Sequence, residues 1–246
     1  MYLLSLRSPR SPAISHRRSR RTLDFSSTYA RLLEELGRPP HAFTSLRASF
    51  VARTGEYGVE DPWFDARQRA FLDDAITHAS VLGNVELGDA LLVNLASACQ
   101  RAMRGVFEVH RSGDTYMFRD AWTLASFYIV PGDQELARAL SVTEQAMVDA
   151  RLLNWQNRIV VLPGAFFHPE EATPSLSNLI AFAREDGRDR EACLDAFMRM
   201  ERSFRVSSRV KAAHVYRRDV FTRKAGNSPT RGFKNLRGGS SQGGAT

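Results

Sequence analysis

Apolar residues recur at helical spacing over most of the chain. In residues 26–37, the side chains of Tyr29, Leu32, Leu33 and Leu36 are three or four positions apart, which places them on one face of a helix. The same spacing predicts further helices over residues 42–52, 64–82, 85–103, 119–129, 134–155, 175–185, 188–200 and about 207–222. The pattern therefore indicates an all-α fold.

Turn and capping signals separate these predicted helices. Asp61 and Thr173 are each followed by proline, which combines an N-cap side chain with a residue suited to the first turn of a helix. Residues 110–118 are typical of a turn. The β-branched run 159–162 interrupts the helical pattern and predicts either a short strand or a buried loop. Residues 223–246 are rich in glycine and serine, which predicts a disordered tail.

Three helix-turn-helix units resemble one another around their turns. When the first two are aligned, Gly83 matches Gly132 and Ala90 matches Ala139, and a third unit covers residues 178–200. Glycine permits the turn, and a small alanine side chain allows two helices to approach closely. Stacking of such units would bury a continuous core. The expected fold is therefore a stack of helical hairpins with disordered basic termini.

The third unit resembles the pentatricopeptide-repeat family. The residues that match the family's motif are Leu179, Ile180, Gly187, Ala192, Phe197 and Met200, with one residue inserted between Ala192 and Phe197. The turn glycines of the three units are 49 and 55 residues apart, whereas the family repeat is about 35 residues. The resemblance implies degenerate helical repeats of a family that binds single-stranded RNA. It assigns no base-reading position here, and contacts with other proteins are the expected use of the hairpins.

Charge is strongly segregated along the chain of 246 residues, whose net charge is +7. Residues 1–23 contain six arginines and no acid, and residues 202–246 contain eleven basic residues and one acid. The intervening residues 24–201 carry 17 basic and 26 acidic side chains, a net charge of −9. An acidic body would repel RNA phosphates, so we expect RNA contacts in the carboxyl-terminal region.

The amino-terminal segment has the composition of an organelle transit peptide. Residues 1–23 are rich in arginine and serine, free of acidic residues, and begin with a short apolar stretch. This predicts a mitochondrial targeting segment and a matrix location. Two alternatives remain open: a basic arm that binds nucleic acid directly, and an artefact of the assigned start site. Residues 24–222 are then the helical-repeat domain, and residues 223–246 are the basic tail.

The carboxyl-terminal cations form the predicted RNA-binding site. Tyr216, Phe221 and Phe233 lie among them, and their rings can stack on bases. A solubilising tail is the plainer alternative, and contact with anionic lipid is a lesser one. The predicted RNA-binding residues are Arg205, Arg209, Lys211, Arg217, Arg218, Arg223, Lys224, Arg231, Lys234 and Arg237.

No motif for catalysis, cofactor binding or metal binding stands out. Asp61, Asp65, Asp73 and Asp74 cluster near a predicted helix start, where helix capping and a solvated face explain them. His168 precedes a proline and two glutamates, but the proline breaks the spacing of a helical metal site. We therefore expect no enzyme activity, no catalytic or metal-binding residues, no cofactor and no small-molecule substrate.

These patterns predict a non-catalytic component of a mitochondrial ribonucleoprotein, most simply the mitochondrial ribosome. The helical body would contact neighbouring proteins of a large complex while the tail binds ribosomal or other RNA. Two alternatives remain: an accessory subunit of a mitochondrial respiratory complex, and a free RNA-processing factor of the pentatricopeptide-repeat type. Salt-sensitive co-sedimentation with ribosomal subunits would support the ribosomal interpretation.

Overall fold

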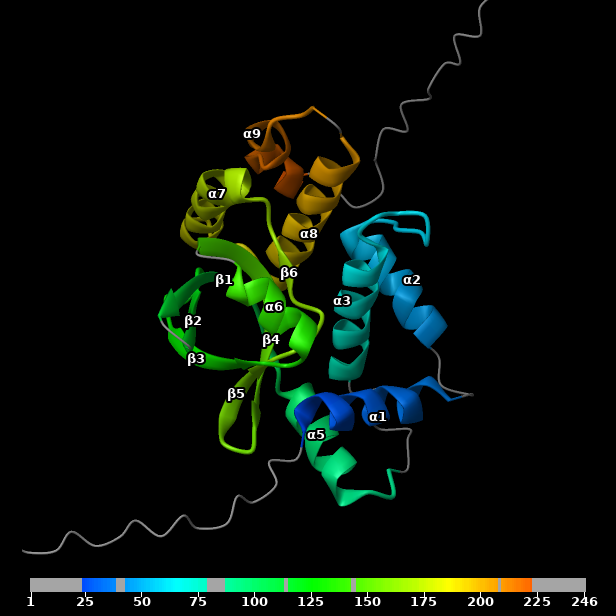
Figure 1. Ribbon diagram of the computed structural model, residues 1–246. Coiled ribbons are helices and arrows are strands. Elements are labelled where there is room, and N and C mark those ends of the chain that lie inside the picture. Colours follow the sequence, from blue (N-terminus) through cyan, green and yellow to red (C-terminus); the bar gives the residue numbers. More distant parts are fainter. Residues whose placement is uncertain are drawn as a thin grey trace, which may run out of the picture.

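The computed structural model describes residues 24–38, 43–78, 87–112, 115–142, 145–207 and 209–222. A group of helices comes first, a group of strands follows, and a second group of helices ends the described chain (Figure 1). None of the helices in these ranges is both long and apolar enough to span a membrane. The predicted targeting segment and basic tail lie outside the described residues.

The elements have the following bounds. The first helical group contains α1 Phe25–Gly37, α2 Phe43–Thr54, α3 Phe64–Thr77 and α5 Ala90–Gln100. The strand group contains β1 Met103–Ser112, β2 Thr115–Asp120, β3 Ser126–Pro131, α6 Gln134–Ser141, β4 Gln145–Trp155, β5 Arg158–Val161 and β6 Phe166–Phe167. The last group contains η1 Glu170–Ala172, α7 Thr173–Glu185, α8 Arg190–Val206, α9 Ala212–Val215 and η2 Arg218–Thr222.

Five strands close into a barrel, so the prediction of an all-α stack of helical hairpins is wrong. Antiparallel pairs join β1 to β2, β2 to β3 and β4 to β5, while β3 and β5 run parallel. An antiparallel pairing of β4 with β1 closes the ring, and β6 adds to the middle of β4. Closure leaves no open sheet edge in the barrel, because each of the five strands has two neighbours.

The predicted helix over residues 134–155 is confirmed only at α6 and fails over β4, whose burial pattern resembles that of a helix, and the predicted helix over residues 119–129 is replaced by the end of β2 and by β3. Val148 and Leu152 of β4 lie in the barrel interior, whereas Met147 and Leu153 on its other face pack against helices. A strand that is buried on both faces has apolar residues at successive positions and loses the alternation that identifies a strand. The predicted turn over residues 110–118 is likewise occupied by the ends of β1 and β2.

The turn glycines differ in what they do. A Cβ atom on Gly132 would lie 2.2 Å from the carbonyl oxygen of Val161, so glycine allows the β3–α6 turn to pass close to β5. This turn joins a strand to a helix, which contradicts its alignment with a helical-hairpin turn. Gly187, with φ of +62°, does connect two helices, α7 and α8. The third unit is therefore confirmed as a helical hairpin, whereas Gly83, the turn glycine of the first unit, lies outside the described residues.

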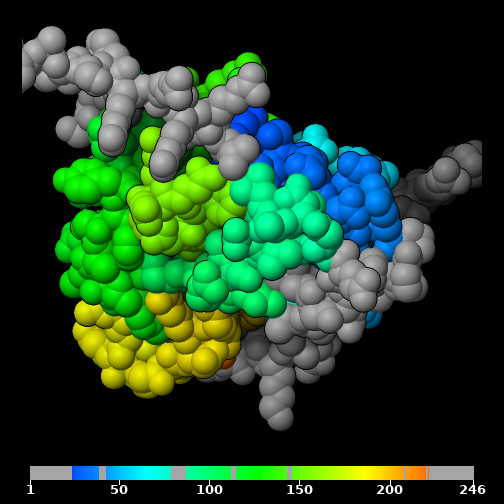
Figure 2. All heavy atoms as spheres, turned by 90° about the horizontal axis from the view of Figure 1, so that it is seen from below, coloured from blue at the N-terminus to red at the C-terminus, as the bar shows by residue number. Residues whose placement is uncertain are grey.

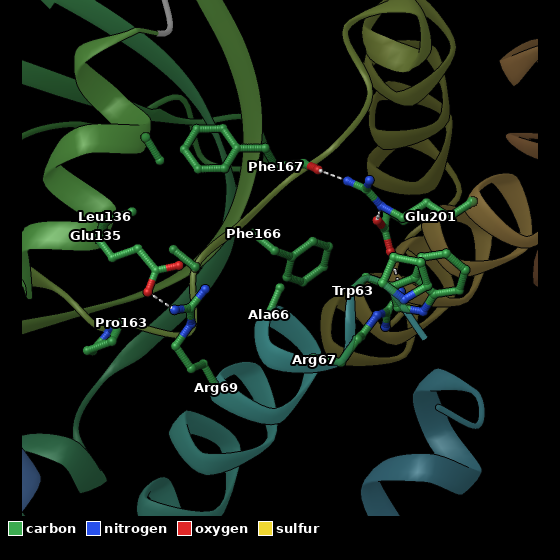
Figure 3. Close-up of a pocket in the computed structure, with 14 residues that line it drawn as sticks. Trp63, Ala66, Arg67, Arg69, Glu135, Leu136, Pro163, Phe166, Phe167 and Glu201 are labelled. Atoms are coloured by element: carbon green, nitrogen blue, oxygen red, sulfur yellow. Dashed lines mark hydrogen bonds and ion pairs between the residues drawn. The ribbon is translucent and has the colours of Figure 1, made fainter. Parts of the chain in front are cut away.

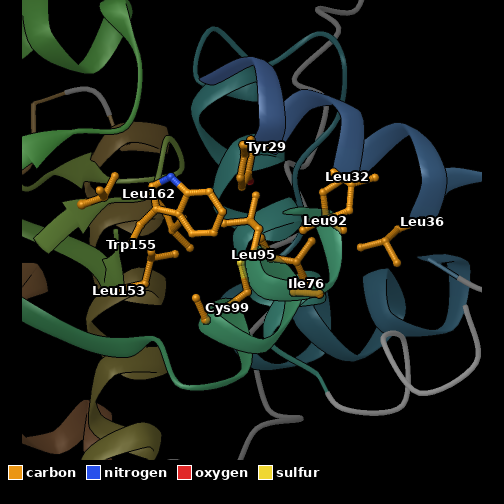
Figure 4. Close-up of a cluster of buried hydrophobic side chains, with 13 residues drawn as sticks. Tyr29, Leu32, Leu36, Ile76, Leu92, Leu95, Cys99, Leu153, Trp155 and Leu162 are labelled. Atoms are coloured by element: carbon orange, nitrogen blue, oxygen red, sulfur yellow. The ribbon is translucent and has the colours of Figure 1, made fainter. Parts of the chain in front are cut away.

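Helices cover the barrel on two sides. One apolar cluster joins α1 and α5 to β4 and β5, where Leu32 and Leu95 pack with Leu153 and Trp155 (Figure 4). A second joins α7 and α8 to the outer residues of β1 and β4. Figure 2, a view from below, shows α1 in blue and α5 in blue-green beside the yellow-green β4–β5 hairpin, with green barrel strands exposed on the opposite flank. Among the described residues, one flank of the barrel is therefore covered by no helix.

A buried ionic network connects the barrel to both helical groups. Arg104 of β1 bonds Asp149 of β4 at 3.1 Å and Asp195 of α8 at 2.7 Å. Arg53 of α2 bonds the same Asp195 at 3.0 Å and Asp74 of α3 at 2.6 Å, and Arg151 of β4 also pairs with Asp74. Burial acts to lower the pKa of Arg104, but the two carboxylates more than offset it, so its pKa is raised. Three arginines and three aspartates thus form the centre of this network, and Glu191 is a further partner of Arg104 at 3.7 Å.

Asp73 and Asp74 are both buried, so the predicted solvated acidic face is wrong for them. Asp73 accepts hydrogen bonds from the hydroxyl of Tyr29 and from the backbone N–H of Gly164 at 2.7 Å. Burial raises the pKa of Asp73 to about 7, even though both hydrogen bonds act to lower it. These two carboxylates connect α3 to α1, α2 and the barrel, where sequence analysis expected them to face water.

His168 connects the barrel to the last helical group. It follows β6 directly, is buried, and its Nδ1 lies 3.1 Å from the hydroxyl oxygen of Tyr216, which follows α9. Its backbone N–H donates to the carbonyl of Met147 at 2.9 Å. Burial lowers the pKa of the His168 imidazole to about 4, so it is neutral at pH 7. The histidine that suggested a metal site is therefore a packed contact between two parts of the fold.

Replacing His168 with glutamine should reduce the acid sensitivity of the protein. The unfolded chain protonates this histidine near its ordinary pKa of about 6.5, whereas the native state does so only near pH 4. Stability is therefore full above pH 6.5 and falls as the pH decreases toward 4, by on the order of 3 kcal/mol from this residue. Urea unfolding at several pH values should show a flatter profile for His168→Gln than for the wild type.

His110 provides the matched control for this prediction. It lies on β1 with a partly exposed side chain, so His110→Gln should leave the slope of stability against pH close to that of the wild type. An unchanged slope for His168→Gln would show that burial of this imidazole does not govern acid unfolding.

Candidate nucleic-acid interface

The open flank of the barrel is a continuous sheet surface made by β1, β2 and β3. We call it the β1–β3 face; its outward-pointing residues are Glu108, His110, Met117, Arg119, Ser126, Tyr128 and Val130. They alternate with inward-pointing residues such as Phe107, Phe118 and Ile129, which are buried in the barrel interior. This alternation sends one set of side chains into the core and the other toward solvent.

Tyr128 is the most exposed aromatic side chain of this face, at 71 %. In the strand register it lies opposite Met117, and Met117 lies opposite His110, so the three form a row across β3, β2 and β1. Val130, 40 % exposed, lies on the same side of β3 two residues further along. An exposed ring on a flat sheet surface offers a platform on which a nucleobase can stack.

Cationic and polar side chains border this platform. Arg119 lies opposite Ser126 in the register, which places it diagonally next to Tyr128 on the same face. Its guanidinium is 3.4 Å from the Glu108 carboxylate, and its side chain remains 43 % exposed. Since a surface ion pair of this length is weak, the guanidinium can exchange Glu108 for a phosphate at small cost.

The predicted RNA-binding residues that the structure describes lie elsewhere, near α8 and α9. Arg209, Lys211, Arg217 and Arg218 are exposed there. Arg217 pairs with Asp219 at 3.2 Å, and the Arg218 guanidinium lies 4.3 Å from the ring centre of Phe182 on α7. Figure 1 shows this region beyond the α7–α8 end of the barrel, while β2 and β3 form the flank. The two surfaces are therefore separate.

Arg205 differs from the other predicted cations. Its Nε pairs with the carboxylate of Glu201 one turn earlier on α8, and its Nη2 donates to the carbonyl of Phe167 at 3.4 Å. This guanidinium is therefore held by α8 and β6, although its side chain is 41 % exposed. The remaining predicted residues, Arg223, Lys224, Arg231, Lys234 and Arg237, lie outside the described residues.

Sequence reasoning missed the β1–β3 face because it assigned residues 119–129 to a helix. A helix over these residues would have placed Tyr128 and Arg119 on unrelated faces. The useful signal was composition: residues 126–130 read Ser-Phe-Tyr-Ile-Val, a run of aromatic and β-branched side chains that favours a strand. Choosing between helix and strand by residue type, and not by spacing alone, would have identified β3.

Metal or small-cofactor chemistry has little support on this face. In the part of the chain that the structure describes, no group of three histidine, cysteine or acidic side chains is placed to hold a metal ion. Besides the Glu108 carboxylate, the face offers an aromatic ring, a thioether, an imidazole and a guanidinium, which are groups suited to stacking and to hydrogen bonding.

Comparisons with protein-family models, with curated proteins and with solved structures found no match for this chain. Function is therefore inferred from the β1–β3 face and the carboxyl-terminal cations themselves.

Proposed function

We propose that this protein is a non-catalytic RNA-binding component of a ribonucleoprotein. The β1–β3 face stacks bases of a single strand, and the carboxyl-terminal cations bind its phosphates. The observation that carries the proposal is Tyr128, whose ring is 71 % exposed on a sheet surface that no described helix covers. Val130, 40 % exposed on the same side of β3, extends the apolar surface beside this ring, and adjoining exposed apolar side chains are a feature of binding surfaces.

The connectivity of the barrel supports this proposal. Its strand order is β1-β2-β3-β5-β4 with closure onto β1, and a helix lies between β3 and β4. The same connectivity occurs in the five-stranded OB barrel, a fold that often binds oligonucleotides on the face of its second and third strands. Because a fold does not fix a function, the connectivity adds to the argument from Tyr128 and does not replace it.

Charge segregation supports different roles for the carboxyl-terminal cations and the β1–β3 face. Residues 202–246 carry a net charge of +10 on a body of −9. Phosphate contacts by the carboxyl-terminal cations would supply affinity and fast encounter, and both effects weaken as salt rises. Stacking on Tyr128 depends less on salt and gives a preference for unpaired bases. Single-stranded RNA is therefore the expected ligand.

The cellular setting stays a prediction. The mitochondrial address rests on residues 1–23, which lie outside the described residues. Three settings remain to be distinguished: the ribosome, a respiratory complex and free RNA processing. Of these, only a role in a respiratory complex does not require RNA binding.

Replacing Tyr128 with alanine should weaken binding of single-stranded RNA by roughly 5- to 100-fold, the usual range for loss of one base-stacking ring. Fluorescence anisotropy with labelled single-stranded oligoribonucleotides and the full chain measures this. Tyr128→Phe keeps the ring and should bind nearly as well as the wild type.

Val59 supplies a second control, because it is 80 % exposed in the loop between α2 and α3. Val59→Ala removes exposed apolar surface away from the β1–β3 face and should leave RNA binding unchanged. If Tyr128→Ala binds RNA as tightly as the wild type, the proposed role of this face is wrong, whatever the carboxyl-terminal cations contribute.

A further inference from the structure

A second candidate site lies at the α6 end of the barrel, away from the β1–β3 face. It is a partly open cavity of about 290 Å³ lined by α3, α6, the segment 163–167 and α8 (Figure 3). Its apolar wall includes Leu136, Phe166 and Phe167, and its polar wall includes Trp63, Arg67 and Glu201. A cavity of mixed character and this size suits a small molecule with an apolar body and one polar end.

The polar wall contains N–H groups without an acceptor. Trp63 immediately precedes α3 and Arg67 lies one turn later, so both point from the same side of the helix. The Nε1 of Trp63 and the Nη1 of Arg67 are buried and have no hydrogen-bond partner. An unsatisfied buried donor costs about 1–3 kcal/mol, and more when the group is charged. Two such donors on residues that line one cavity indicate a place for an acceptor.

The rest of Arg67 is held rigidly. This residue is only 3 % exposed, and its Nη2 donates to the carbonyl of Met198 at 2.7 Å and pairs with Glu201. Its guanidinium also lies 5.4 Å from the ring centre of Phe166. These contacts fix the direction of the unpaired Nη1, so a ligand would meet a preformed donor and not a freely rotating one.

The charges around the cavity leave one positive charge unbalanced. Arg67, Arg69 and Arg205 line it together with only two carboxylates, Glu135 and Glu201. Glu201 already serves both Arg67 and Arg205, and Glu135 serves Arg69. Figure 3 shows Arg69 reaching toward Glu135 while Arg67 lies near Trp63 and Glu201, with the Phe166 ring between the two arginines. An anionic group at the Trp63–Arg67 end would neutralise the remaining positive charge of the three arginines.

We propose that this cavity binds a small organic anion, with its carboxylate or phosphate head at Trp63 and Arg67 and its apolar body against Phe166 and Phe167. The head would accept hydrogen bonds from the indole Nε1 and the guanidinium Nη1, which are screened from solvent in the present arrangement. Arg205 lines the same cavity, and its side chain is 41 % exposed. A change of its rotamer would give the anionic head access to the cavity. The site is independent of the proposed RNA contact.

Calorimetric titration of the full chain with benzoate and with phenyl phosphate tests the proposal and separates the two head groups. At least one should bind with a dissociation constant on the order of 0.1–1 mM, as expected for a ligand of this size in a matching site. Benzyl alcohol, which has the same ring without the charge, should bind at least roughly tenfold more weakly. Tyr128→Ala should leave these affinities unchanged.

Two variants test the position of the anion. Trp63→Phe keeps an aromatic ring but removes the Nε1 donor and should weaken binding by roughly 5- to 10-fold. Ala66→Leu places a larger side chain on the cavity wall and should abolish binding. Trp122→Phe is the matched control, because Trp122 packs against the α7–α8 cluster and does not line the cavity.

Intrinsic fluorescence supplies a readout that does not depend on affinity. The chain contains three tryptophans, and a ligand-induced change in emission should persist in Trp122→Phe and disappear in Trp63→Phe. The proposal is overturned if neither anion binds below about 10 mM, if benzyl alcohol binds as tightly as the anions, or if Trp63→Phe and Ala66→Leu both bind like the wild type.

Discussion

Replacing Arg104 with methionine should lower the free energy of unfolding by about 3–5 kcal/mol, the usual cost of removing one partner from a buried ion pair. Arg104 is 6 % exposed and contacts Asp149 at 3.1 Å and Asp195 at 2.7 Å. Methionine has a similar length but no charge, so it would leave the buried carboxylate of Asp149 without its cation. Arg53 would still pair with Asp195.

Urea unfolding at pH 7 measures this effect, and Arg119→Met is its matched control. Arg119 lies on the neighbouring strand β2, but its side chain is 43 % exposed and its ion pair with Glu108 is at the surface. Its replacement should change stability by less than about 1 kcal/mol. Equal effects of the two substitutions would show that the Arg104 network does not connect the barrel to α8.

Replacing Phe118 with alanine should cost about 3–5 kcal/mol of stability, whereas replacing its neighbour Met117 should cost less than about 1 kcal/mol. Phe118 is fully buried in the barrel interior, with its ring centre 5.6 Å from that of Phe107. Met117 lies on the outward β1–β3 face. Adjacent residues of one strand point to opposite sides of the sheet, so a strong difference between them is characteristic of β2.

Thermal or denaturant unfolding of these two variants therefore tests the register of the barrel. A slip of one residue would turn Met117 inward and Phe118 outward and reverse the order of the two effects. Comparable losses for both substitutions would contradict the assignment of an open outer face, and with it the exposed position of Tyr128.

The sequence predicted α1, α2, α3, α5, α7 and α8 well and the barrel poorly, while the predicted helix over about residues 207–222 contains only the short α9 and η2. Helix α1 shows a regular apolar stripe with Asp24 as its cap, and α7 and α8 flank a turn at Gly187. Such helices have one apolar face, so their spacing is visible in a single sequence. Strand β4 lies between helices and a filled barrel interior, and its burial depends on partners far away in the chain. Local spacing contains no information about those partners.

The candidate sites likewise differ in how far the sequence alone could predict them. The carboxyl-terminal cations were visible because charge segregation is a property of the sequence itself. Tyr128 could be recognised as a surface residue only once β2 and β3 were paired. Arg67 lies on a helix that the sequence predicted and Trp63 directly precedes that helix, but their unpaired N–H groups depend on α8 and β6 closing over them. No local pattern predicts an unsatisfied donor.

Photocrosslinking tests the proposed RNA contact most directly. The full chain would be irradiated with single-stranded RNA that contains 4-thiouridine, digested with trypsin and analysed by mass spectrometry. Arg119 and Arg138 flank the peptide that contains Tyr128, residues 120–138. We predict that this peptide carries crosslinked nucleotide and that Tyr128→Ala greatly reduces its yield. Crosslinks confined to residues 202–246, with none in peptide 120–138, would contradict a role for the barrel in RNA binding.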